Sequence, residues 1–354
     1  MSLARLALPA VLLAAACSAT PEDPHHCGAQ GYDCLGGTCS SGVCGPVTLA
    51  SGIKSGFALT VDSTRVYWVD GAKVSMVPKS GGPATLFGTT PSNGGTPLSI
   101  ATDGTYAYVA AFVLGASESG GIYRVPTDGS AVTLLDAATS AIAVAVDPKG
   151  CVEWSYWGDP NKPGAIARLC PGSTQPEILA DETNQAPIGL AVDATGTFWS
   201  EAVPSLSDGC AEAPGALRMV SPPSPPVTVA RGHFGGIGVS LGTGLATAGD
   251  ALYWRDVCFG TVYRLPHGAS SPTALAAVAS TPAVDGYGYS GLVTADALGA
   301  YVTSDAGVVR VPKDGGPAVL VAAGQHPVGM AVDDTRIYLL AYEGALVAVA
   351  KPPR

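Results

Sequence analysis

The sequence predicts an all-β fold, a seven-bladed β-propeller with four antiparallel strands in each blade. Short β-branched and aromatic runs recur along the chain, and Gly, Pro and Asp turn residues separate them. One strand-turn-strand pattern repeats seven times between residues 46 and 354. A further run at 46–51 has the sequence of the one strand that the last copy lacks. These observations predict a closed ring of blades.

The repeated unit is clearest at residues 61–82. Val66-Tyr67-Trp68-Val69 reads as a strand, Asp70-Gly71 as a tight hairpin turn, and 74–78 as the return strand. An apolar run precedes each copy and a fourth run follows it, at a spacing typical of propeller blades. The copies begin at Asp62, Asp103, Asp147, Asp193, Ala248, Asp296 and Asp333, with Ala248 in place of the aspartate. We expect the aspartates to accept turn N–H groups and the aromatic residues to pack between blades.

The ring is expected to close through its N-terminal strand. The seventh copy ends after its third strand, whereas Pro46 to Ser51 resembles fourth strands such as 132–135. Pairing of these segments would remove an exposed sheet edge.

The cysteines provide a test of the strand pairing that the repeat predicts. If the third copy turns over residues 158–163, Cys151 lies directly opposite Cys170, close to disulfide distance. Cys210 and Cys258 fall in second-to-third-strand loops of adjacent blades, and we predict that they also pair.

The N-terminus reads as a signal peptide over residues 1–16, with an apolar stretch too short to span a bilayer. It resembles a bacterial lipoprotein signal, in which the following cysteine, here Cys17, becomes the lipidated N-terminus. Ala14 stands where that pattern prefers leucine, so ordinary cleavage is the alternative. Ser18 resembles an outer-membrane sorting signal. Residues 17–26 are predicted to be a lipidated tether.

A Cys-rich segment follows at 27–45 and has too few apolar residues for a core of its own. Two disulfides are expected there, in one of three pairings, and a zinc site is the alternative. The segment would be a rigid stalk or a small interaction knob. Its four cysteines are Cys27, Cys34, Cys39 and Cys44.

The strand motifs Val66-Tyr67-Trp68-Val69-Asp70 and Leu252-Tyr253-Trp254-Arg255-Asp256 resemble those of YWTD and NHL-type propellers of secreted proteins. The resemblance covers residues 46–354. It implies a propeller that binds proteins or other ligands, and six blades are the alternative because those families usually have six. The whole chain also resembles bacterial surface lipoproteins with a Cys-rich stalk.

Ligand contacts on a propeller usually lie in loops. One face collects the loops between second and third strands together with the links between blades. We predict a binding face there, with these candidates: Glu201, His233, Phe234, Arg255, Asp256, Tyr287, Tyr289, His326, Tyr342 and Glu343. A catalytic alternative would pair His233 with Glu201, or His326 with Glu343.

The formal net charge of −10 argues against nucleic-acid binding. No catalytic or cofactor motif is present, so no cofactor or metal is expected and an enzyme is the less favoured interpretation. The sequence therefore predicts an exported, lipid-anchored, monomeric scaffold in the bacterial envelope, at the outer membrane on its periplasmic or surface side. It would bind an envelope protein, peptide or glycan, and the alternative is a lyase or hydrolase.

Overall fold

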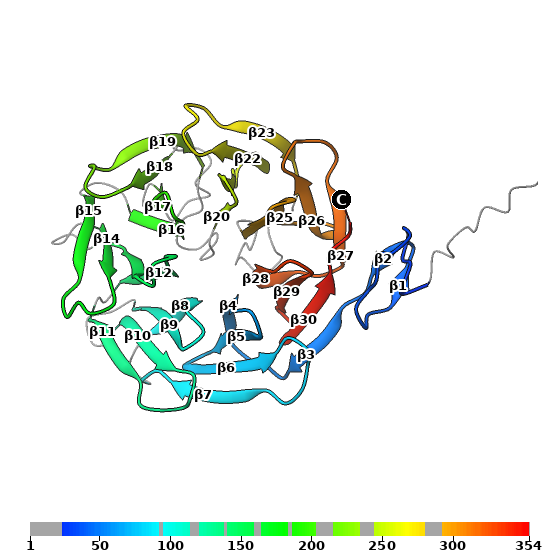
Figure 1. Cartoon of the computed structure of the whole chain (residues 1–354), viewed down its shortest axis with the longest axis horizontal. Helices are drawn as coiled ribbons and strands as arrows, with labels where there is room; N and C mark the ends of the chain where they lie inside the picture. The colour runs from blue at the N-terminus through cyan, green and yellow to red at the C-terminus, as the bar shows by residue number, and fades with distance from the viewer. Residues whose placement is uncertain are drawn as a thin grey trace, which may run out of the picture.

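The computed structural model describes residues 23–91, 95–113, 120–137, 140–158, 164–182, 186–202, 215–233, 244–279 and 292–353. The strands form a ring of seven four-stranded antiparallel sheets around a central axis (Figure 1). The seven-bladed prediction is confirmed, and the six-bladed alternative is wrong. The described residues contain no helix with the length and hydropathy that a membrane crossing requires.

Each blade uses consecutive strands, from the axis outward. Blade one contains β4 (Gly56–Val61), β5 (Arg65–Asp70), β6 (Lys73–Pro78) and β7 (Thr85–Thr89). Blade two contains β8 (Thr96–Thr102), β9 (Tyr106–Phe112), β10 (Gly121–Pro126) and β11 (Thr133–Asp136). Blade three contains β12 (Ala141–Val146), β13 (Val152–Tyr156), β14 (Gly164–Leu169) and β15 (Glu177–Glu182). Blade four contains β16 (Ala186–Val192), β17 (Thr197–Ala202), β18 (Gly215–Val220) and β19 (Val227–Gly232).

The later blades follow the same order, and the last one borrows its outer strand. Blade five contains β20 (Leu245–Ala248), β21 (Ala251–Arg255), β22 (Thr261–Pro266) and β23 (Thr273–Ala277). Blade six contains β24 (Val293–Asp296), β25 (Gly299–Ser304), β26 (Gly307–Pro312) and β27 (Val319–Ala323). Blade seven contains β28 (Pro327–Val332), β29 (Arg336–Ala341), β30 (Ala345–Ala350) and the N-terminal β3 (Val47–Ser51).

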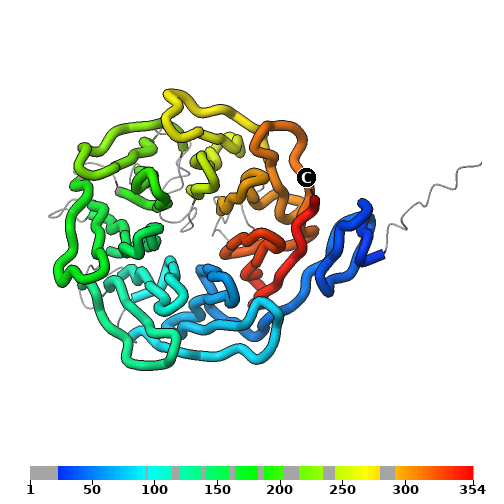
Figure 2. The backbone as a smooth tube through the Cα atoms, viewed as in Figure 1, coloured from blue at the N-terminus to red at the C-terminus, as the bar shows by residue number. Residues whose placement is uncertain are grey.

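The pairing of β3 with β30 closes the ring, as the sequence predicts. Val47 lies opposite Ala348 and Ser51 opposite Ala345, so the blue start of the propeller runs beside its red end (Figure 2). Leu49 points into the core shared by blades seven and one. The edge of β30 is thereby covered.

The aromatic pair of the repeat packs between blades because neighbouring strand residues point to opposite faces of a sheet. Tyr67 contributes to the core shared with blade two, and Trp68 contributes to the core shared with blade seven. Both side chains are almost completely buried. Alternation within one strand therefore supplies both interfaces of blade one.

The repeat aspartate organises the turn between the first and second strands. Asp62 Oδ1 accepts hydrogen bonds from the backbone N–H groups of Thr64 and Arg65, at 2.6 and 2.8 Å. Its Oδ2 accepts a hydrogen bond from the Tyr67 hydroxyl at 2.6 Å. The aspartate-to-tyrosine bond recurs between Asp103 and Tyr108, Asp296 and Tyr301, and Asp333 and Tyr338. The turn contacts follow the prediction, and the tyrosine contact adds to it.

A basic residue after the third strand of one blade reaches the turn aspartate of the preceding blade. Lys79 Nζ lies 2.7 Å from Asp333 Oδ2, and Lys351 Nζ lies 2.5 Å from Asp296 Oδ2. In blade four Phe198 replaces the tyrosine. The His267 ring stacks on Phe198, and its Nε2 lies 3.1 Å from Asp193 Oδ2, although without hydrogen-bond geometry. These contacts link neighbouring blades at the end of the ring that carries the turns.

Replacing Asp333 by alanine should lower the free energy of unfolding by about 2 kcal/mol. The change leaves the ammonium of Lys79 and the hydroxyl of Tyr338 without their carboxylate partner, and both side chains are largely buried. Denaturant unfolding of D333A and of the control D334A checks this, because Asp334 is an exposed neighbour. Equal stability of the two variants would contradict the structural role.

Cys151 and Cys170 form a disulfide at the end of the β13–β14 pairing, where Val152 lies opposite Leu169. This is the pair that the hairpin register predicts. Cys258 is also disulfide-bonded, and its predicted partner Cys210 lies outside the described residues.

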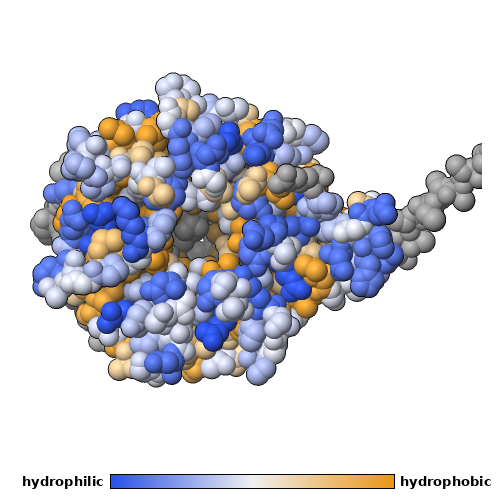
Figure 3. Space-filling view, in the orientation of Figure 1, coloured by the Kyte–Doolittle hydropathy of each residue, from blue (hydrophilic) through white to orange (hydrophobic). Residues whose placement is uncertain are grey.

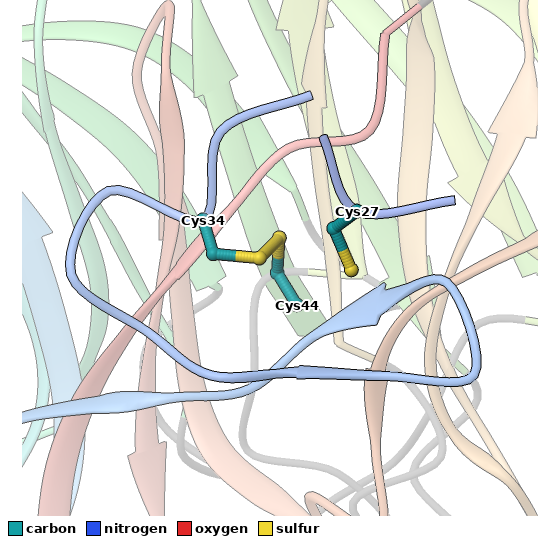
Figure 4. A group of neighbouring side chains, drawn as sticks. All are labelled: Cys27, Cys34 and Cys44. Carbon is teal, nitrogen blue, oxygen red and sulfur yellow. A yellow bond between two sulfur atoms is a disulfide. The ribbon is translucent and has the colours of Figure 1, made fainter. Parts of the chain in front are cut away.

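The Cys-rich segment forms a small module around β1 (Cys39–Ser40) and β2 (Val43–Cys44). Its disulfides join Cys27 to Cys39 and Cys34 to Cys44. Figure 4 shows the Cys34–Cys44 bond with the Cys27 sulfur beside it. Since all four sulfur atoms are oxidised, they do not act as thiolate ligands in the manner of the zinc alternative. Disulfides persist in oxidising compartments, which indicates an extracytoplasmic protein.

The module packs on the propeller rather than projecting from it as a stalk. Tyr32 is buried, and its hydroxyl donates a hydrogen bond to the carbonyl oxygen of Ala350 at 3.0 Å. Arg336 donates a hydrogen bond to the carbonyl oxygen of Leu35 at 2.8 Å. The buried cysteines join a cluster with Val321 and other residues of blades six and seven. The module therefore covers the rim beside the closing blade (Figure 1).

Candidate functional site

Antiparallel pairing divides the connections of every blade between two ends of the ring. The loops between second and third strands, such as 257–260 and 342–344, lie at the same end as the links between blades, such as 324–326. We call this end the loop face. The opposite end, which carries the turns between first and second strands and between third and fourth strands, is the turn face.

Exposed aromatic side chains distinguish the loop face among the described residues. Phe259, between β21 and β22, is 68% exposed, and Tyr342, between β29 and β30, is 58% exposed. The strongly exposed aliphatic residues of the propeller instead lie on outer strands, one each on β7, β11, β15 and β19: Leu86, Leu134, Ile178 and Val227. In the space-filling view, hydrophilic residues cover much of the visible face, and hydrophobic ones show at the rim and around the central opening (Figure 3).

The blade-five part of the loop face is built around Asp256. Its Oδ1 accepts hydrogen bonds from the backbone N–H groups of Cys258 and Phe259, both at 3.0 Å. Its Oδ2 lies 3.1 Å from the His233 ring Nδ1 and accepts the His233 backbone N–H at the same distance. The Phe259 ring meets the His233 imidazole edge-on at 5.3 Å. This aspartate thus fixes a loop of blade five and the residue that follows β19.

The geometry of this cluster suits proton transfer better than metal binding. The carboxylate of Asp256 is nearly buried, whereas the His233 ring keeps 16% of its surface exposed. Asp256 can orient the imidazole through Nδ1 and leave Nε2 for a ligand. The donor atoms of His233, Asp256 and Cys258 all lie within 4.8 Å of one another. The Cys258 sulfur is already in a disulfide, which leaves only two free donors for a metal.

A second group of predicted residues lies on blade seven. The backbone N–H of Tyr342 donates to the carbonyl oxygen of His326 at 3.4 Å, which brings their two loops together. The side chains of His326 and Glu343 are exposed. Within the described residues, no ion pair joins these two side chains, so the structure does not provide the predicted His326–Glu343 pair.

Two predicted face residues are interior instead. Glu201 is buried, accepts a hydrogen bond from Trp199 Nε1 at 3.0 Å and lies 3.6 Å from Arg218 Nη1, so His233 pairs with Asp256 rather than with Glu201. Arg255 is also buried, and its guanidinium donates to the carbonyl oxygens of Thr303 and Val278. Arg255 links blade five to blade six, the hydrogen bond and the ion pair of Glu201 lie within its own blade, and neither side chain presents its charge at the surface.

The remaining predictions for this face, Phe234, Tyr287 and Tyr289, lie outside the described residues. The sequence interpretation missed Phe259. Its signal was the position directly after Cys258 in a short second-to-third-strand loop, where an aromatic residue has little core to enter.

No protein-family model matches the sequence, and no curated protein is detectably similar to it. Solved structures share the fold. A structure titled "Streptogramin B lyase structure" matches with a TM-score of 0.59 and 10% identity, covering 87% of this chain and 97% of that one. "YCF48 bound to D1 peptide" matches with a TM-score of 0.57 and 11% identity, covering 87% of this chain and 96% of that one.

BamB from Moraxella catarrhalis matches with a TM-score of 0.51 and 12% identity, covering 86% of this chain and 99% of that one. At these identities the likeness shows the fold alone. The chain is a seven-bladed β-propeller with a disulfide-linked module on its rim. Its seven blades depart from the six that are usual in the YWTD-type propellers whose strand motifs it resembles.

Proposed function

We propose that the protein is an exported scaffold whose loop face binds a protein, peptide or glycan at the cell envelope. The supporting observation is that Phe259 and Tyr342 are both strongly exposed on loops of that one face. Exposed aromatic side chains offer large contact area at low entropic cost, and they are enriched where proteins bind partners. The propeller of the structure titled "YCF48 bound to D1 peptide" is an example of the fold with a bound peptide.

Affinity capture from an envelope extract tests this proposal. The exported protein and the double variant F259A/Y342A should be compared with L86A/L134A, which removes exposed aliphatic residues from the outer strands. We expect a partner that is held by the wild type and by L86A/L134A and lost by F259A/Y342A. A partner retained by all three proteins would contradict a binding role for this face.

We also propose that Cys17 carries a lipid anchor, because the cysteine directly follows the apolar segment, as in a bacterial lipoprotein signal. Residue 17 lies outside the described residues. Metabolic labelling with an alkyne-bearing fatty acid tests the anchor. The wild-type chain should be labelled and C17S should not, whereas labelling of both would place the lipid elsewhere.

The His233–Asp256 pair supports a second candidate function, a lyase or hydrolase on the same face. An aspartate that holds an imidazole through Nδ1 leaves Nε2 to take or give a proton during bond cleavage. The fold is shared with a streptogramin B lyase, so streptogramin B, simple esters and lactones are the first compounds to assay.

Activity of the wild type that is lost in H233Q and kept in H326Q would support the catalytic candidate. His326 is the matched control, because it is an exposed histidine of the same face that forms no ion pair with a described residue. Equal activity of the two variants would contradict it.

A further inference from the structure

Four blades carry an arginine at an equivalent position of the third strand, and one of these arginines differs from the rest. Each lies opposite the equivalent residue of the second strand: Arg124 opposite Tyr108, Arg168 opposite Glu153, Arg264 opposite Tyr253 and Arg310 opposite Tyr301. This equivalence allows their partners to be compared directly. The four residues are Arg124, Arg168, Arg264 and Arg310.

Three of the four guanidinium groups donate to an acceptor of the protein, although the buried Nε of Arg168 makes no hydrogen bond. Arg168 donates to Glu177 at 2.8 Å. Arg264 donates to Asp250 and to the Tyr253 hydroxyl, at 3.0 and 3.2 Å. Arg310 donates to the carbonyl oxygens of the C-terminal prolines at 352 and 353, at 2.8 and 3.0 Å. Each of these arginines is therefore a structural link.

Arg124 has no comparable partner among the residues that the structure describes. Its guanidinium lies over the Tyr106 ring, 4.9 Å from the centroid, and its buried Nε makes no hydrogen bond. The Arg168 Nε is unpartnered as well, so Arg124 differs in that no described residue accepts a hydrogen bond from any of its nitrogens. The stacking on Tyr106 holds the planar group in place before any ligand arrives.

The arginine lines a pocket of about 270 Å³ on the turn face of blade two. The walls come from the turn after β8 and from the turn between β10 and β11. Most of its lining side chains are polar, and four of them carry an aliphatic hydroxyl group: Thr105, Thr127, Ser130 and Thr133. The volume is near the lower limit for small-molecule sites and suits one sugar ring rather than a folded partner.

We propose that this pocket binds the carboxylate of a sugar acid, either a free uronate or the end of an acidic glycan. A single guanidinium fork matches one carboxylate in a bidentate manner. The hydroxyl groups of the wall can donate to and accept from the hydroxyls of a sugar. Asp128, which is exposed at the pocket, opposes a second negative charge, so a monoanionic carboxylate fits better than a phosphate. The site lies opposite the loop face and is independent of the function proposed there.

A titration followed by saturation-transfer NMR tests the site on the whole exported protein. The ligands are glucuronate and galacturonate, an oligogalacturonate, and the uncharged controls glucose and galactose. We expect uronates to saturate the wild type with a dissociation constant of about 1 mM, and the neutral sugars to bind at least about tenfold more weakly. The monosaccharide and oligosaccharide arms distinguish a free uronate from the end of a glycan.

Variants locate the binding. R124Q should weaken uronate binding at least about tenfold, and R124K should fall between R124Q and the wild type because it keeps the charge without the fork. R264Q is the matched control and should bind uronates as the wild type does, because its guanidinium is engaged by Asp250 and Tyr253. Thermal unfolding of R124Q should be close to that of the wild type, since the change removes the contact with the Tyr106 ring but no hydrogen bond to a described residue.

Several results would overturn the proposal. These are equal binding of glucose and glucuronate, unchanged uronate affinity in R124Q, or no saturable uronate binding. Inorganic phosphate or an N-acetylglutamate peptide that binds as tightly as the uronates would also overturn it, because the site would then be a general anion or peptide site.

Discussion

A chain that begins at residue 53 should fail to form a stable propeller, whereas a chain that begins at residue 46 should remain folded. The first lacks β3, the outer strand of blade seven, and the second keeps it. We expect the chain from 53 to unfold more than about 10 °C below the chain from 46, or to aggregate.

The size of this effect follows from what β3 covers. Its removal exposes the edge of β30 and takes Leu49 out of the core shared by blades seven and one. Loss of one buried leucine side chain alone costs about 2–5 kcal/mol. The open edge also offers a strand for pairing with a second chain.

The chain from 46 is the internal control, because it loses the Cys-rich module but not the closing strand. It should be less stable than the full chain by a smaller amount, since Tyr32 no longer covers the rim at blade seven. Equal unfolding temperatures for the chains from 46 and 53 would show that β3 does not close the ring.

Glu153→Gln should stabilise the protein at pH 8 by up to about 3 kcal/mol and have little effect at pH 4.5. Glu153 is only 2% exposed and occupies the position that tyrosine holds in most other blades. Burial raises the pKa of the Glu153 carboxyl to about 7, and the lowering effects of the Thr197 hydroxyl and of Arg168 do not offset it.

The sign of the pH dependence follows from proton binding. Between the ordinary glutamate pKa of about 4.5 and the folded value of about 7, the folded state binds more protons than the unfolded state. The free energy of unfolding of the wild type therefore falls as the pH rises through that window. Glutamine does not titrate and can still accept the hydrogen bond that Thr197 donates to Glu153.

Chemical denaturation of the wild type and E153Q at intervals between pH 4.5 and 8 measures this effect. E177Q is the matched control, because Glu177 is an exposed glutamate that binds the same Arg168. The stability difference between E153Q and the wild type should grow with pH, and by more than that of E177Q. A difference for E153Q that does not change with pH would contradict a buried, protonated carboxyl.

Much of the fold could be predicted from the sequence because each blade repeats the same local pattern. The aspartate, the aromatic pair and the return strand recur, so errors in one copy are corrected by the others. The closing strand was recognisable because 46–51 matches the fourth strands. The opposition of Cys151 and Cys170 followed from counting residues along a hairpin, which requires no knowledge of packing.

The candidate site was less predictable. Strand pairing places a residue along its strand, but it does not by itself say whether the side chain points into the core or to the surface. The alternation of side chains between the two faces of a strand could have corrected the placement of two residues on the binding face. Glu201 lies two residues after Trp199 and shares its buried side, and Arg255 stands in the same relation to Tyr253. The pairing of His233 with Asp256 joins two loops, and no periodicity in the sequence specifies how two loops meet.

The most direct test of the proposed binding role is photocrosslinking from single positions of the exported protein in its own envelope. A photoreactive phenylalanine analogue should be placed at Tyr342 on the loop face or at Leu134 on the outer rim, both of which are exposed. We expect a discrete crosslinked partner from position 342 and none from position 134. The same partner crosslinked from position 134 and absent from position 342 would contradict binding through the loop face.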